Sequence, residues 1–249
     1  MKIRLLLVLG ASIPLWFQSP NSGTDGQALA ADRRVDLEII LAVDVSASVD
    51  RVEAALQRGG YVTALRHPAV LRAIRAGPAG AIAATYVEWA GWSFQRTVVD
   101  WRVIEDAPSA RAFVDLLTER PIASVPYTSI SGLIDFARRR FRDNGYDGLR
   151  RVIDILGDGP NSDGRSVRAA RDAAVAEGIT INGIPIASIR PNPDGTSPAA
   201  LLDFHYRHYV VGGPGAFVME VTAFESFADT LVEKLVREIR GSAAVSERR

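Results

Sequence analysis

The order of apolar runs and amphipathic segments is the feature of this sequence that most limits its fold. From Leu37 onward, short runs rich in β-branched residues alternate with longer segments whose apolar residues recur at helical spacing. The first run, residues 37–45 (LEIILAVDV), is almost continuously apolar, which is typical of a strand buried on both faces. This alternation predicts an α/β domain with a Rossmann-like, mostly parallel central sheet and helices on both faces.

About six strands follow from the pattern. The runs 81–90 and 94–104 are joined by Gly91-Trp92-Ser93, a length typical of a hairpin, which predicts one antiparallel edge strand. A helical tract is expected over 50–74, broken near Gly59-Gly60 and Pro68, and Asp50 with Glu53 resembles a capping box at its start. The other expected strands are 37–45, 151–156, 179–186 and 216–221, and the other expected helices are 108–119, 129–142, 166–177, 199–209 and 224–240.

The first 30 residues have the pattern of a secretory signal peptide. Lys2 and Arg4 precede an apolar stretch over 5–17, and Ala28-Leu29-Ala30 matches an A-x-A cleavage site. The stretch is shorter than the roughly 20 residues that span a bilayer, and it contains a glycine and a proline. We therefore expect removal of 1–30, export to the periplasm or the medium, and no transmembrane segment in the mature chain; the alternative is an uncleaved anchor. The domain is expected over 31–240, followed by a flexible tail over 241–249.

Composition excludes several classes of function. The sequence contains no cysteine, so disulfides, thiolate zinc sites and thiol nucleophiles are absent. Lys and Arg together number 29, as do Asp and Glu, so the net charge of zero provides no overall field that would attract nucleic acid. We expect no nucleic-acid partner.

Oxygen-bearing side chains cluster where three expected loops meet. Asp44, Ser46 and Ser48 follow the first strand, Thr128 precedes a helix, and Asp158 lies between two glycines after the strand 151–156. Ligands of open parallel sheets bind beyond the carboxyl ends of the strands, where such loops converge. Two carboxylates and three hydroxyls suit a small, hard cation such as Mg²⁺ or Mn²⁺ and suit zinc poorly.

This order of motifs resembles the von Willebrand factor A domain and its metal-ion-dependent adhesion site. The resemblance covers about residues 35–240 and implies that Asp44, Ser46, Ser48, Thr128 and Asp158 are the five metal ligands. The segments 157–186, 86–91 (YVEWAG) and 212–218 (GGPGAFV) are also similar to an uncharacterised family of exported bacterial A-like domains. One departure is Gly157, where adhesive A domains usually carry Thr.

The resemblance implies a protein-binding module, with no catalytic residue, that captures the carboxylate of a partner protein through the metal. One alternative is a metal-dependent hydrolase with Asp158 or His205 as base, and another is a structural A-like domain that binds no metal. Asp203, His205 and His208 are weighed as a second metal site and interpreted as ordinary packing. Of the two tryptophans beside the hairpin turn, Trp89 and Trp92, we expect one in the core and the other at a contact surface.

Two further polar features have two interpretations each. Asp154 lies about 13 Å along the strand from Asp158, so it cannot bind the same ion, and it is expected to be a satisfied buried carboxylate rather than a support for the metal site. Asn161, Ser162 and Asp163 either line the rim of the site or form the turn that follows Asp158.

Overall fold

A computed structural model describes residues 32–186, 198–221 and 226–241. The expected signal peptide, and the expected tail after residue 241, lie outside these residues. Within the described ranges, no helix combines the length and the apolarity that crossing a bilayer requires.

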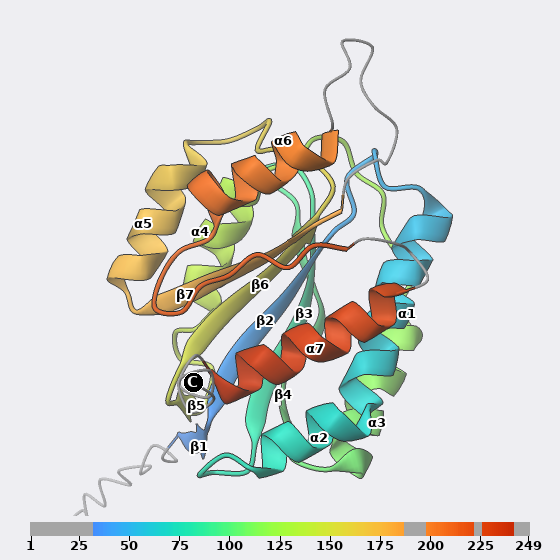
Figure 1. Cartoon of the computed structure of the whole chain (residues 1–249), viewed down its shortest axis with the longest axis vertical. Helices are drawn as coiled ribbons and strands as arrows, with labels where there is room; N and C mark the ends of the chain where they lie inside the picture. Colours follow the sequence, from blue (N-terminus) through green and yellow to red (C-terminus); the bar gives the residue numbers. More distant parts are fainter. Residues whose placement is uncertain (1–31, 187–197, 222–225, 242–249) are drawn as a thin grey trace, which may run out of the picture. The chain divides into compact units, whose positions relative to one another are not determined.

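Five strands form the central sheet in the order β4-β3-β2-β6-β7 (Figure 1). All neighbouring strands are parallel except β3 and β4, which are antiparallel. The mostly parallel sheet with an antiparallel edge strand is therefore confirmed. The strands are β2 (Leu37–Asp44), β3 (Ile82–Trp89), β4 (Gln95–Ile104), β6 (Arg151–Gly157) and β7 (Ile179–Pro185).

Helices cover both faces of this sheet (Figure 1). Alternate residues of β2 point in opposite directions, so that Leu37, Ile39 and Leu41 belong to one apolar core and Ile40 and Ala42 to the other. The first core is covered by α1 (Arg51–Arg66), α2 (Pro68–Arg75), α3 (Ala107–Thr118) and α7 (Phe227–Arg240). The second is covered by α4 (Ile130–Arg140), α5 (Val167–Ala176), α6 (Pro198–His205) and a π-helical turn, η1 (Tyr206–Val210).

The first helical tract differs from the expectation at one of its two breaks. It ends at His67, before Pro68, and the His67 side chain caps α2 by accepting a hydrogen bond from the backbone N–H of Ala69. It does not break at Gly59-Gly60, and α1 continues through both residues. A Cβ atom on Gly60 would lie 2.7 Å from the ring of Phe227, so this glycine allows α7 to approach α1 closely.

The prediction of a sixth strand over 216–221 is wrong. Val218 forms only a single bridge to Gly183, because the backbone N–H of the preceding residue, Phe217, donates its hydrogen bond to the side chain of Asn182 and not to the backbone of β7. A small parallel sheet, in which β1 (Arg33–Val35) pairs with β5 (Tyr146–Gly148), was not expected from the sequence.

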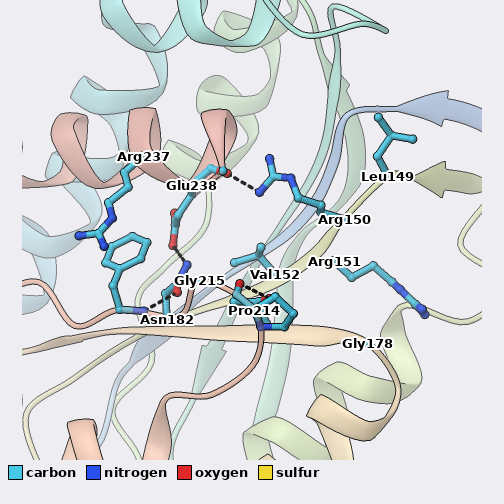
Figure 2. Close-up of a pocket in the computed structure, with 13 residues that line it drawn as sticks. Leu149, Arg150, Arg151, Val152, Gly178, Asn182, Pro214, Gly215, Arg237 and Glu238 are labelled. Carbon is cyan, nitrogen blue, oxygen red and sulfur yellow. Dashed lines mark hydrogen bonds between the residues drawn. The ribbon is translucent and has the colours of Figure 1, made fainter. Parts of the chain in front are cut away.

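A buried charge network joins α7 to the sheet. Lys234 is fully buried and forms ion pairs with Asp154 on β6 and with Glu238 one turn later on α7. The Tyr61 hydroxyl donates to Asp154 at 3.0 Å, and the Asn182 amide donates to Glu238 at 3.0 Å (Figure 2). Although burial by itself lowers the pKa of Lys234, the two carboxylates raise it overall. The interpretation of Asp154 as a satisfied buried carboxylate is therefore confirmed.

We expect Lys234→Met to lower the free energy of unfolding by about 3 to 5 kcal/mol at pH 7, because Asp154 and Glu238 would remain buried without a cation. Urea denaturation of the mature chain measures this change. The matched control is Arg111→Met, whose side chain is 73% exposed and should cost less than about 1 kcal/mol. Equal unfolding midpoints for the two variants would contradict the prediction.

Candidate metal centre

Three loops are held together beyond the carboxyl ends of the central strands. The backbone N–H of Val125 donates to the carbonyl of Val45 at 3.1 Å, and that of Ser129 donates to the carbonyl of Ala90 at 2.8 Å. The third loop is attached to the second, because the N–H groups of Ser162 and Asp163 both donate to the Thr128 carbonyl. Main-chain bonds therefore fix the positions from which the five candidate side chains project.

Asp44 is the last residue of β2 and is fully buried. Its Oδ1 atom accepts a hydrogen bond from the backbone N–H of Ser46 at 2.7 Å. Its Oδ2 atom is also buried but has no hydrogen-bond partner in the part of the chain that the structure describes. One oxygen of this carboxylate is therefore available for a ligand.

The two serines connect the first loop to Asp158. The Ser46 and Ser48 hydroxyls lie 3.0 Å apart, and the Ser48 hydroxyl donates to Asp158 Oδ1 at 2.9 Å. Thr128 lies against the same turn, since its Oγ1 atom is 3.7 Å from the position that a Cβ atom would take on Gly159. The structure thus brings together all five residues that the sequence analysis selected.

The electrostatics of the site are unfavourable without a cation. Burial, followed by the charge of Asp158, raises the pKa of Asp44 to about 7. Burial also raises the pKa of Asp158. Among the described residues, neither carboxylate forms an ion pair with Lys, Arg or His. These orphaned, oxygen-only groups fit a divalent cation.

A third carboxylate, Glu53, lies beside the site and was not expected there from the sequence. Burial and the charges of Asp158 and Asp50 raise the pKa of Glu53, which places this side chain near the candidate centre. The spacing of Asp50 and Glu53 indicated a capping box, but only Asp50 caps the helix, and Glu53 accepts a hydrogen bond from Gln57. The described residues contain no group of three or more His, Cys, Asp or Glu side chains suited to a metal, so a cation here would depend on the hydroxyls.

The residues after Asp158 mainly hold the loops in place. The Asn161 side chain accepts from the N–H of Ser131 at 2.9 Å, and Asp163 accepts from the N–H of Trp92 at 2.8 Å. The Ser162 hydroxyl donates to the Thr128 carbonyl at 3.2 Å. The structure therefore favours the turn-forming interpretation of this segment over direct contact with a metal.

The alternative cluster of Asp203, His205 and His208 does not converge. Asp203 pairs with Arg207, and His208 bonds to the carbonyl of Phe204. His205 accepts from the N–H of Asn161 at 3.4 Å. The interpretation of these three residues as packing residues is supported.

The overall architecture is shared with von Willebrand factor A domains of known structure. A von Willebrand factor type A protein from Catenulispora acidiphila aligns over 83% of this chain and 43% of its own, with a TM-score of 0.55 and 14% identity. Proximal thread matrix protein 1 from the mussel byssus, in a structure with a zinc-occupied MIDAS motif, aligns over 82% and 47%, with a TM-score of 0.52 and 15% identity. The pilus adhesin SpaC from Lactobacillus rhamnosus GG aligns over 84% and 31%, with a TM-score of 0.59 and 10% identity.

This chain therefore spans less than half the length of each of these proteins, and it has the fold of a von Willebrand factor A domain. It belongs to the family described as "Protein of unknown function (DUF1194)", whose model matches residues 34–243. No curated protein matches the sequence. The family description defines no activity, so the function must be inferred from the site.

The raised pKa of Asp44 predicts how metal-free protein responds to pH. Since the ordinary pKa is 3.8 and the folded value is about 7, the folded state holds this proton over a range in which the unfolded chain has released it. Stability should therefore fall as the pH rises from about 4 to about 7. Asp44→Asn should remove this loss and raise the free energy of unfolding at pH 8 by about 1 to 4 kcal/mol.

Urea denaturation in EDTA at pH 5 and pH 8 measures this effect. The matched control is Asp147→Asn, because the Asp147 side chain is 68% exposed. A variant at Asp44 that is less stable than the wild type at pH 8 in EDTA would contradict the prediction.

Proposed function

We propose that this protein is an exported, divalent-cation-dependent binding module that captures an acidic group of a partner protein. The side chains that hold the cation in this proposal are Asp44, Ser46, Ser48, Thr128 and Asp158. The observation that carries the proposal is the buried, unpartnered Oδ2 atom of Asp44, beside a second carboxylate and without a cationic neighbour among the described residues.

Three other buried carboxylates of the described chain are paired with cations. Glu88 faces Arg58, and Asp154 and Glu238 face Lys234. A buried carboxylate is costly unless it is paired. A bound cation would supply the positive charge that Asp44 lacks and that Arg58 and Lys234 supply to the other three carboxylates.

The donor set favours Mg²⁺ or Mn²⁺. Carboxylate and hydroxyl oxygens suit these hard ions, whereas zinc prefers nitrogen and sulfur ligands. The zinc-occupied motif of the mussel byssus protein supports a divalent metal in this fold without defining the ion here. When bound, the ion would supply positive charge and an open position for an external carboxylate.

The surroundings of the site indicate the kind of acidic group. Tyr127, directly before Thr128, is 71% exposed, and Trp92, on the hairpin turn, is 65% exposed, whereas Trp89 is in the core. Tyr127 has a φ of 67°, an unfavourable conformation for an aromatic residue, and such strain is concentrated at functional sites. Val52, in the first turn of α1, is 70% exposed. A carboxylate flanked by apolar residues matches these surroundings.

The arrangement favours binding over hydrolysis, because its histidine lies away from the two serines. The Ser46 and Ser48 hydroxyls bond to each other and to Asp158, and His205 is engaged with the N–H of Asn161. Among the described residues, the base that contacts a serine is Asp158, and in the proposed site Asp158 is a ligand of the cation. Solved proteins of similar fold include an adhesin and a matrix protein, which agrees with a binding role.

We expect Thr128→Ala to weaken partner capture by about five- to 150-fold, because it removes one neutral oxygen from the cation. Immobilised mature protein is incubated with an envelope extract in Mn²⁺ or in EDTA, and the affinity of the EDTA-sensitive partner is then measured. The matched control is Thr118→Ala at the exposed end of α3, which should bind like the wild type.

The partner itself provides the second arm of this experiment. Replacing its acidic residue by the amide should abolish capture, whereas replacing a neighbouring apolar residue should weaken it. Turnover of esters, phosphoesters or peptides that requires Asp158, without any EDTA-sensitive partner, would establish the hydrolase alternative instead.

Export is tested separately. The A-x-A pattern at Ala28-Leu29-Ala30 predicts that protein recovered from the periplasm or medium begins at Ala31. Intact-mass analysis of the exported protein measures this end. Retention of Met1 would contradict cleavage while leaving the binding proposal intact.

A further inference from the structure

A small space beside Asp44 is created by Gly157 at the end of β6. Asp44 pairs with Trp89 across the sheet, and Val43 pairs with Leu156, so Asp44 and Gly157 lie at the same level on adjacent strands. A Cβ atom on Gly157 would lie 2.7 Å from the Tyr206 hydroxyl, 3.1 Å from Trp89 Cζ2 and 3.2 Å from Asp44 Oδ2. Three side chains therefore converge on one point.

Each of these side chains has a buried polar atom without a partner in the described chain. The atoms are the Tyr206 hydroxyl, the Trp89 indole nitrogen and Asp44 Oδ2, and all three residues are fully buried. Unpaired buried polar groups are few in folded proteins, because each costs free energy. The Tyr206 hydroxyl and the Trp89 N–H are donors and Asp44 Oδ2 is an acceptor, so the hydrogen-bonding requirements of the three groups are complementary.

The position of Tyr206 depends on two glycines. A Cβ atom on Gly183 of β7 would lie 2.5 Å from Tyr206 Cδ1, and one on Gly157 would meet the hydroxyl. Gly183 pairs with Ile155 and Gly157 pairs with Pro185, so the two glycines project on the same face, and the tyrosine ring extends over both toward Asp44. Tyr206 also begins the π-helical turn η1, and such turns frequently occur at functional sites.

From this geometry we infer that Tyr206 is a positioning residue whose hydroxyl donates a hydrogen bond to Asp44 Oδ2 through one water molecule, which is shared with Trp89. The bond occupies one lone pair of Oδ2 and leaves the other for the cation, and it holds the carboxylate in the orientation that presents it to the cation, so this part of the inference rests on the proposed function. Gly157 and Gly183 are then required by the tyrosine, because a side chain at either position would displace it.

The first test uses metal-free protein, so that it is independent of cation binding. In EDTA at pH 8, Tyr206→Phe should lower the melting temperature by about 2 to 4 °C, the change expected for one lost hydrogen bond in a chain of this size. A hydroxyl that had no partner would give the opposite sign, because its removal would relieve an unpaired buried group. In an Asp44→Ala background, Tyr206→Phe should lose its destabilising effect.

The second test measures cation binding by calorimetry with MnCl₂. Tyr206→Phe and Gly157→Ala should each weaken Mn²⁺ binding by about five- to tenfold, the loss expected for one hydrogen bond. The matched control is Tyr209→Phe on the same turn, whose ring contacts His205 and which should bind Mn²⁺ like the wild type. Circular dichroism verifies that each variant is folded.

The outcomes separate the two proposals. Wild-type protein that takes up neither Mn²⁺ nor Mg²⁺ would overturn the proposed function, whereas the stability measurements in EDTA would still decide the Tyr206–Asp44 bond. A higher melting temperature for Tyr206→Phe, or the same change in the presence and absence of the Asp44 carboxylate, would overturn the inference.

Discussion

The burial of Asp44 at the end of β2, without a cationic side chain in the described structure, is the constraint on which the rest of the candidate centre depends. β2 lies in the middle of the sheet, between β3 and β6, so its last residue is enclosed by the loops that follow all three strands. The parallel arrangement also brings Asp158 to the same edge, which adds a second negative charge where water has limited access. Such an arrangement is costly by itself, and it is explained most directly by a positive ligand.

Local patterns in the sequence were sufficient wherever a structural feature depended on neighbouring residues. The apolar run of β2, the hairpin between β3 and β4 and the His67-Pro68 break all follow from periodicity and backbone chemistry, and all are found. Features that depend on distant contacts were wrong or missed. α1 continues through Gly59-Gly60 because α7 packs there, and 216–221 fails to form a strand because Asn182 takes a hydrogen bond from it. Neither contact is visible in the local sequence.

The same distinction applies to the site. The five candidate ligands could be selected because four of them follow strand ends and Thr128 precedes a helix, an order that a sequence records directly. Glu53 and Tyr206 were not found, because Glu53 was assigned to a helix cap and Tyr206 lies nearly 50 residues beyond Asp158 on another element. Gly157 was noted only as the absence of a threonine. The structure gives this absence a physical reason, since the Tyr206 hydroxyl fills the space that a side chain at residue 157 would occupy.

The opposite end of the sheet shows how structural charges differ from those of the candidate centre. A cavity of about 360 Å³ lies there, lined by Arg150, Arg151 and Arg237 (Figure 2). Each guanidinium already has a partner. Arg150 donates hydrogen bonds to the Glu238 and Ile239 carbonyls at the end of α7. Arg151 donates to the Glu177 carbonyl, and the Arg237 guanidinium stacks 3.8 Å from the centre of the Phe217 ring. The Arg150 and Arg237 contacts hold the last helix against the sheet, and the Arg151 contact holds the end of α5. Three arginines in a cavity would by themselves suggest an anion site, but their partners account for them, whereas Asp44 has no cationic partner among the described residues. The presence of a partner for each charge, rather than the number of charges, therefore separates the two ends of the domain.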